Sequence, residues 1–236
     1  VFTSSFANHS GNRNPNSSSL QFISGASLTA MPPEPSKIYL LAGLGNPGRQ
    51  YRDTRHNIGF MVIDRLSERL IGSDKSGATP RVQMRALIYD FRHEGRRIIL
   101  AKPQTYMNDS GIAVAALARF YKIPLENMVV AHDDVDLPFG TLRLRPGGGS
   151  AGQKGIASII ERLGTQDFPR LRMGLGRPPA SRLAAAYVLE EFSRSEENGL
   201  PIILDRAAEA ALTFVLEGLN KAMNQFNGIG DTVDED

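Results

Sequence analysis

Short apolar runs alternate along the chain with longer segments in which apolar residues recur every three or four positions. The first pattern is typical of buried strands and the second of amphipathic helices. The predicted strands lie at 37–42, 128–131, 141–145 and 171–175, with a hairpin at 82–91 and 96–101. The predicted helices run from 57 to about 70, from 109 or 110 to 121, and over 155–163. This alternation predicts one α/β domain with a mixed, mostly parallel twisted sheet flanked by helices.

Two of the helices carry signals at their N-termini. Asn57 is a residue type that caps helices, and the helix after it would bury Phe60, Ile63, Leu66 and Leu70. A last helix is predicted to begin near Leu200 and Pro201, because proline is favoured in the first turn. The apolar face of that helix would consist of Ile203, Ala207, Ala210, Phe214 and Val215.

The first 33 residues differ in composition from the rest. They contain eight serines, four asparagines, no acidic residue and a single basic one, Arg13. Such a segment cannot bury enough apolar surface to fold, so we predict disorder at 1–33. A serine-rich, acid-free composition is typical of an organellar transit peptide, and the single arginine suits a chloroplast better than a mitochondrion. The alternative is an ordinary disordered extension. The predicted domain then spans 34–230, followed by an acidic tail at 231–236.

Composition excludes several kinds of site. The chain has 236 residues and no cysteine, so it has no disulfide, cysteine nucleophile or thiolate metal site. No apolar run reaches the roughly 18 residues of a membrane span, so no membrane association is expected. Residues 34–230 contain 26 basic and 21 acidic residues, a net charge of +5. This mild excess is compatible with a polyanionic partner.

Two glycine-rich segments match motifs whose usual chemistry their surroundings do not support. The sequence GLGNPG at 43–48 fits the dinucleotide fingerprint, in which the last glycine opens a helix. Here a polar stretch without apolar periodicity follows at 49–55, so no dinucleotide site is predicted. The sequence GGSAG at 148–152 fits the nucleophile-elbow pattern. In that fold the catalytic histidine follows the serine, whereas all four histidines precede Ser150, which is therefore not a predicted nucleophile.

A third cluster, HDDVD at 132–136, contains residue types that bind metal ions. Alternate residues of a strand face opposite sides, so these side chains cannot all converge without a turn. Acids that cap backbone amides at a strand end explain most of the cluster equally well. A metal-dependent phosphohydrolase built on this cluster remains the weaker alternative, and no metal is expected.

Four polar residues from separate segments are predicted to meet at one edge of the sheet. Asn46 follows the first strand, Asn108 follows the strand that ends near 101, and Asp133 follows the strand at 128–131, while His56 precedes the first helix. Ligands bind at the carboxyl ends of strands in open α/β sheets. A histidine oriented by an aspartate can take a proton from water, and two asparagine amides can serve an oxyanion and the attacking water. The set therefore suits ester hydrolysis without a covalent intermediate.

Five segments together resemble one enzyme family. They read GLGNPGRQYRDTRHNIGF at 43–60, KPQTYMNDSG at 102–111, HDDVDLPFG at 132–140, LRLRPGGGSAGQKG at 142–155 and FPRLRMGLGRP at 168–178. In this order, over roughly 37–226, they resemble bacterial-type peptidyl-tRNA hydrolase, in a plant or cyanobacterial-like, organellar form. The resemblance implies a monomer on a mixed-sheet α/β fold that cleaves the ester between a peptide and the 3′ ribose of tRNA, without metal or organic cofactor, and so recycles tRNA from aborted translation.

The resemblance also implies a role for each site residue. His56 would be the general base and Asp133 its partner, with Asn46 and Asn108 placing substrate and water. Tyr51 and Met107 would form walls of the peptide-side cleft. The residues that bind tRNA phosphates would be Arg143, Arg145 and Arg172. The first two are two positions apart, so on a strand they would share one face.

The chain departs from the family pattern at one place in the substrate-binding loop. Many members carry His-Asn where this chain has Gln153 and Lys154. Glutamine can donate and accept hydrogen bonds as histidine does, but it does not titrate near neutral pH. An RNA-binding cofactor without catalysis, as in plastid intron splicing, is the alternative function.

Overall fold

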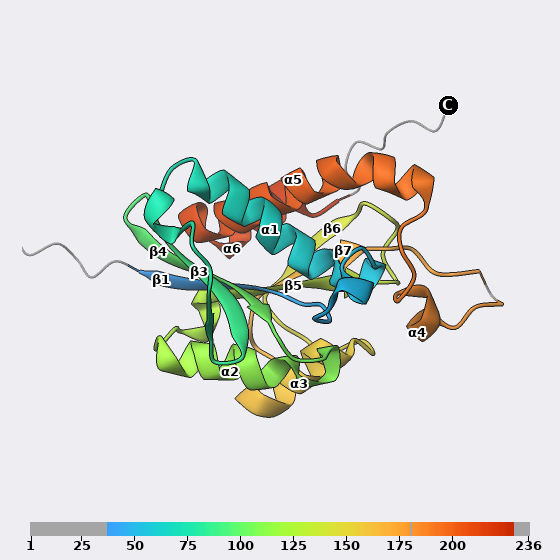
Figure 1. Ribbon diagram of the computed structural model, residues 1–236, viewed down its shortest axis with the longest axis horizontal. Coiled ribbons are helices and arrows are strands. Elements are labelled where there is room, and N and C mark those ends of the chain that lie inside the picture. The colour runs from blue at the N-terminus through green and yellow to red at the C-terminus, as the bar shows by residue number, and fades with distance from the viewer. Residues whose placement is uncertain (1–36, 180, 229–236) are drawn as a thin grey trace, which may run out of the picture. The chain divides into compact units, whose positions relative to one another are not determined.

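The computed structural model describes residues 37–179 and 181–228, which form an α/β structure with one seven-stranded mixed sheet (Figure 1). The predicted segments at 1–33 and 231–236 lie outside the described residues. The strand order is β2-β3-β4-β1-β5-β7-β6. Pairing is parallel from β4 through β1 and β5 to β7, and antiparallel for β2–β3, β3–β4 and β6–β7. The strands are β1 Ile38–Gly43, β2 Arg81–Gln83, β3 Ala86–His93, β4 Arg96–Pro103, β5 Met128–Asp134, β6 Leu142–Arg145 and β7 Arg170–Gly174.

Helices cover both faces of the sheet, as Figure 1 shows: α1, α5 and α6 lie on one face and α2 and α3 on the other. Alternate residues of β1 and β5 therefore enter two separate apolar cores, Leu41 and Val129 on the α1 side, Leu40 and Val130 on the α2 side. Burial on both faces explains why these strands read as continuous apolar runs. The helices are α1 Ile58–Ile71, α2 Ser110–Phe120, α3 Lys154–Leu163, α4 Ala184–Tyr187, α5 Arg194–Glu217 and α6 Leu219–Phe226. None of these described helices is long and apolar enough to cross a bilayer.

The hairpin predicted from 82–91 and 96–101 is confirmed by the antiparallel pairing of β3 with β4, but its first strand is shorter than predicted, because the chain turns back at 84–85. Met84 and Arg85 both have positive φ, of 48° and 59°, and connect β2 to β3. Two consecutive positive φ angles make the tight turn that suits a hairpin. Glycine, asparagine or aspartate usually marks such a turn, and their absence here left it unpredicted.

The last long helix begins earlier than predicted. Ser193 accepts a hydrogen bond from the Glu196 amide at 3.4 Å, and the Glu196 carboxylate accepts one from the Ser193 amide at 2.6 Å. This reciprocal capping box starts α5 at Arg194 and leaves Pro201 inside the helix, not at its beginning. The predicted apolar face is confirmed, since Ala207, Ala210, Phe214 and Val215 are buried and Ile203 packs partly buried against them. Short α4 and the final α6 were not predicted.

The edge strand β6 is covered by the end of α6. The Asn227 side chain accepts a hydrogen bond from the Leu144 amide at 2.6 Å and donates one to the Leu144 carbonyl at 3.1 Å. Gly228 then forms an isolated antiparallel bridge with Leu142. Asn227 thus satisfies both backbone groups of Leu144 as a neighbouring strand would.

Candidate active site

A cavity of about 880 Å³ opens at the carboxyl ends of β1 and β5, where the predicted residues were expected to meet. Its size is in the range of small-molecule sites. It is lined by most of the predicted site residues: Asn46, His56, Met107, Asn108, Asp133, Arg145, Gln153, Lys154 and Arg172. Tyr51 does not line it, and Arg143 lines a neighbouring hollow of about 520 Å³ together with Arg145.

Glycines bring the first loop and α1 into contact at this edge. A Cβ on Gly43 would lie 2.0 Å from the Gly59 carbonyl oxygen, and one on Gly59 would lie 2.5 Å from the Ala131 oxygen. Only glycine allows α1 to approach β1 and β5 so closely. The glycine at 43 in the fingerprint-like segment therefore serves helix packing, and α1 begins ten residues after Gly48, at Ile58. Only a three-residue 3-10 turn, Arg49–Tyr51, follows Gly48 directly, so the segment does not open an α-helix as the dinucleotide fingerprint requires.

His56 and Asp133 form a hydrogen-bonded pair on the cavity wall. His56 lies in a 3-10 turn, Arg55–Asn57, and its Nδ1 is 2.8 Å from Asp133 Oδ2. Their side chains are 13% and 4% exposed. Burial alone would raise the pKa of Asp133, but the His56 contact and a hydrogen bond from Gln153 outweigh it and hold this pKa below its ordinary value. The ionised carboxylate accepts the Nδ1 proton, which leaves His56 Nε2 as a base.

Gln153 holds the second oxygen of the same carboxylate. Its Nε2 donates to Asp133 Oδ1 at 3.0 Å, while its Oε1 accepts from the Ile156 amide at 2.8 Å and caps α3. The cap determines which end of the amide faces Asp133. The departure from the family pattern therefore places a neutral donor at this position, and adjacent Lys154 is exposed at the cavity rim.

Asn46 is held by contacts that orient its side chain. Its Oδ1 accepts from the Met107 amide at 2.8 Å, which leaves the Nδ2 amino group as its free end within the described chain. Asn57 fixes the backbone of Asn46 by accepting from its amide at 2.8 Å and donating to its carbonyl at 3.0 Å. The position of Asn57 before α1 was predicted correctly, but its side chain makes no cap hydrogen bond. Asn108 is exposed on the cavity wall.

Four arginines share one face of β6 and β7. Arg143 pairs with Arg172 and Arg145 with Arg170 across the antiparallel ladder, so all four side chains leave the sheet on the same side. Arg172 is paired with Asp134, whereas Arg143 and Arg145 have no ion-pair partner among residues 37–179 and 181–228. The predicted common face of Arg143 and Arg145 is thus confirmed.

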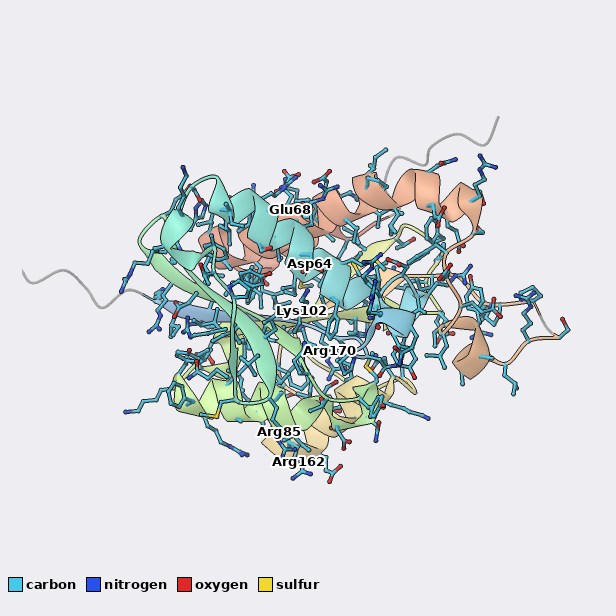
Figure 2. The ribbon with its side chains drawn as sticks, viewed as in Figure 1. Asp64, Glu68, Arg85, Lys102, Arg162 and Arg170 are labelled. Atoms are coloured by element: carbon cyan, nitrogen blue, oxygen red, sulfur yellow. The ribbon has the colours of Figure 1, made fainter. Side chains whose placement is uncertain are left out.

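Arg170 was missed by sequence reasoning, because its burial is invisible in the sequence. This side chain, labelled in Figure 2, donates to the carbonyls of Gly149 at 2.6 Å and of Gly148. Burial, with Arg172 nearby, lowers the pKa of the Arg170 guanidinium. The Arg170 guanidinium therefore holds the backbone of the glycine-rich loop at 147–152. Its serine, Ser150, has no histidine after it, as noted above.

The side chains of the acidic cluster at 132–136 are engaged in ion pairs and backbone contacts. Within the described part of the chain, no three histidine or acidic side chains are placed to hold an ion. Asp134 pairs with Arg172, and Asp136 pairs with Arg177. His132 is buried, its Nδ1 is 2.8 Å from the Asp133 carbonyl, and burial lowers its pKa. Ion pairs and backbone contacts account for the cluster, which removes the basis for the metal-dependent alternative.

Comparison with known proteins gives one consistent result. The family model described as peptidyl-tRNA hydrolase matches residues 40–235. Peptidyl-tRNA hydrolase of Desulforudis audaxviator is 50% identical over 189 residues, which cover 80% of this chain and 92% of the relative. The enzyme of Mycobacteroides abscessus is 46% identical over 193 residues, 81% and 95% of the two chains. The crystal structure of peptidyl-tRNA hydrolase from Acinetobacter baumannii has a TM-score of 0.75 at 32% identity and covers 84% of this chain and 98% of its own.

Proposed function

Because the chain belongs to the peptidyl-tRNA hydrolase family, and is thus an ester hydrolase acting on peptidyl-tRNA, we propose that His56 and Asp133 activate its hydrolytic water. The substrate ester joins the carbonyl of a peptide to the 3′ oxygen of the terminal ribose of tRNA. The observation that carries this assignment is the 2.8 Å contact between His56 Nδ1 and Asp133 Oδ2 on the wall of the cavity.

In the proposed reaction, His56 Nε2 takes a proton from water as the water oxygen bonds to the ester carbonyl carbon. Asp133 stabilises the imidazolium that forms. The tetrahedral intermediate then collapses, the bond from the carbonyl carbon to the ribose 3′ oxygen breaks, and His56 returns its proton to that oxygen. The products are a tRNA with a 3′ hydroxyl and a peptide carboxylic acid, which keeps the second proton of the water and releases it to solvent to become a carboxylate.

Asn46 is proposed to stabilise the negative oxygen of the intermediate. Since its Oδ1 is occupied by the Met107 amide, its Nδ2 is the end available to donate. Asn108 would hold substrate or water from the opposite wall, and Met107 would contact the peptide, as would Tyr51 if the peptide extends beyond the cavity. Gln153 would position Asp133, and Lys154 would lie beside the substrate at the rim.

Arg143, Arg145 and Arg172 are proposed to bind tRNA phosphates. Within the described part of the chain the first two have no ion-pair partner, and they lie on a common face next to the cavity. Phosphate contacts give affinity that depends on salt and ignores sequence, which suits an enzyme that serves many tRNAs. Selection for a blocked amino group would then come from the asparagine-lined cavity.

The function is tested with N-acetylated aminoacyl-tRNA and its unblocked counterpart, using residues 34–236 in excess EDTA. We expect rapid cleavage of the blocked ester only, and loss of cleavage in His56→Ala. Loss of activity in EDTA would contradict a metal-free reaction. Tight tRNA binding without cleavage would instead indicate the RNA-binding cofactor, an alternative to which the relatives named above lend no support.

We also propose that this is a plant or cyanobacterial-like, organellar member, directed to the chloroplast by a transit peptide at 1–33, and that it acts as a monomer. The support is the serine-rich, acid-free composition of that segment. A fluorescent protein fused after residue 36 should enter chloroplasts of transformed plant cells. Accumulation in mitochondria or the cytosol would refute the targeting proposal, and light scattering of the purified protein would test the monomer.

A further inference from the structure

The segment that carries His56 is bound along its backbone to a distant part of the chain. We call residues 187–192, which begin at the last residue of α4, the strap. The His56 amide donates to the Val188 carbonyl at 2.7 Å, and the Arg55 amide donates to the Glu190 carbonyl at 3.0 Å. Thr54 forms an isolated antiparallel bridge with Glu191. The strap therefore pairs with residues 54–56, the last of which is the proposed base.

The strap is also part of the cavity wall. Val188 and Leu189 line the cavity, as do Ala184 and Ala185 of α4. Leu189 is 45% exposed, so this wall presents apolar surface to whatever enters. The position of the wall and the position of His56 consequently depend on the same backbone contacts.

A buried arginine fastens the strap from inside. The Arg55 side chain is 6% exposed, and its Nη1 donates to the Glu191 carbonyl at 2.7 Å. Its Nη2 and Nε donate to the two oxygens of Glu196, at 2.6 and 3.3 Å. The guanidinium lies 4.2 Å from the centre of the Tyr187 ring and 5.7 Å from that of Phe192. Strap residues thus surround it, and the first turn of α5 supplies its counter-ion.

The electrostatics match this geometry. Burial alone would raise the pKa of Glu196, but hydrogen bonds from Arg55 and Ser193 outweigh it and hold this pKa below its ordinary value. The pair is therefore charged at neutral pH. The planar Arg55 guanidinium contacts the Glu196 carboxylate, the Glu191 carbonyl and the Tyr187 ring at the same time. It therefore fixes the relative orientation of these groups more strictly than a lysine ammonium would.

We propose that Arg55 is a positioning residue for hydrolysis, which locks the strap onto the segment of His56 so that the base and the apolar wall keep one relative position. This rests on the proposed role of His56. Arg55 contacts none of the arginines assigned to phosphate. Its loss should therefore lower kcat and leave tRNA affinity unchanged.

The test is the double variant Arg55→Met/Glu196→Gln, which removes both charges and leaves none buried alone. The chain offers a matched control: Arg97 donates to both oxygens of Asp90, at 2.9 and 2.8 Å, and lies 5.1 Å from the Tyr121 ring centre. This second forked, tyrosine-stacked pair lies on β3 and β4, away from the cavity. The control variant is Arg97→Met/Asp90→Asn.

Both double variants are assayed on N-acetylated aminoacyl-tRNA below their unfolding midpoints, together with the Kd of deacylated tRNA. We expect the first to lose at least tenfold in kcat with a Kd within twofold of the parent, and the control to keep kcat within twofold. A kcat within twofold of the parent for both, or an equal loss in both, would overturn the proposal.

If the first variant does not fold, Arg55→Lys decides, because it keeps a cation beside Glu196 without the fork. A several-fold lower kcat at unchanged Kd supports the proposal, and an unchanged kcat refutes it. The parent and His56→Ala are measured in the same series. If His56→Ala keeps its activity, the proposed function fails, whatever the Arg55 variants show.

Discussion

Replacing Gln153 by glutamate separates its two contacts. The substitution keeps an oxygen that can accept from the Ile156 amide, and a carboxylate at the beginning of α3 is favoured by the helix dipole. It removes the amino group that donates to Asp133 Oδ1 at 3.0 Å and places a second acidic oxygen there. The change therefore acts on Asp133 more than on the helix.

The size of the effect follows from the burial of Asp133. The residue is 5% exposed, so water does not replace the lost donor. A hydrogen bond to a buried charge is worth about 2 kcal/mol. If the whole of this hydrogen-bond free energy serves to orient the His56–Asp133 pair in the transition state, kcat should fall by about 30-fold when the bond is lost. The acceptor that caps α3 is kept in this variant, whereas Gln153→Ala loses the cap and about 1 kcal/mol with it.

The loss should also depend on pH. Two carboxyl groups at hydrogen-bond distance cannot both ionise easily, so the pKa of the introduced group is raised. Above that pKa the two carboxylates repel each other and the donor is absent. Below it the introduced group is protonated and donates to Asp133 as the amide did. The ratio of variant to parent kcat should therefore rise as pH falls from about 8 to about 5.

The assay is single-turnover cleavage of N-acetylated aminoacyl-tRNA by both proteins across this range. Urea unfolding of both proteins monitors the cap. A variant that cleaves at the parent rate at pH 8, or a ratio that falls toward low pH, would show that the contact with Gln153 does not position Asp133.

Four further results are expected. His56→Ala should lower kcat by about 10²- to 10⁴-fold with tRNA affinity unchanged in a binding assay, and retained activity would refute the assignment of the base. Arg143→Ala should mainly raise KM and reduce the slope of log affinity against log salt by about 1, whereas an unchanged slope would exclude a phosphate contact. Gly43→Ala, whose Cβ would lie 2.0 Å from a backbone oxygen of α1, should cost on the order of 4 kcal/mol of unfolding free energy in urea. Hydrogen bonds from Arg97 hold the pKa of Asp90 below its ordinary value. The pair therefore stabilises the fold above the unfolded-state pKa of Asp90, and this stabilisation is lost as the pH falls through the folded-state pKa. In Asp90→Asn the unfolding free energy should accordingly fall less steeply between about pH 5 and pH 2 than in the parent.

The sequence predicts the fold best where burial produces an uninterrupted apolar run. β1 and β5 are buried on both faces, and their apolar runs identify them within one to three residues. α5 shows the opposite case: both its capping box and Pro201 are visible in the sequence, and the preference of proline for the first turn predicts the wrong beginning. The turn at Met84 and Arg85 carried no usable signal, because hairpin geometry there overrides the preference of both residues for negative φ.

Part of the site could be predicted because Asn46 and Asp133 lie at the carboxyl ends of two strands that share one edge of the sheet. His56, just before α1, meets Asp133 at the same edge. The supporting contacts could not be predicted in the same way. Arg55 and Glu196 are 141 positions apart, and nothing in either local sequence indicates that they pair. Arg170 reads as one of several arginines, and only its burial distinguishes it.

The contact between Asn227 and Leu144 has a consequence for self-association. An uncovered edge strand offers free amides and carbonyls to a strand of another molecule, which is a route to aggregation. The side chain of Asn227 occupies both groups of Leu144, and Gly228 pairs with Leu142, so two apolar positions of β6 are closed to such pairing. A C-terminal fusion or truncation designed for this protein should therefore leave Asn227 and Gly228 in place, since cutting before them would open the edge of the sheet.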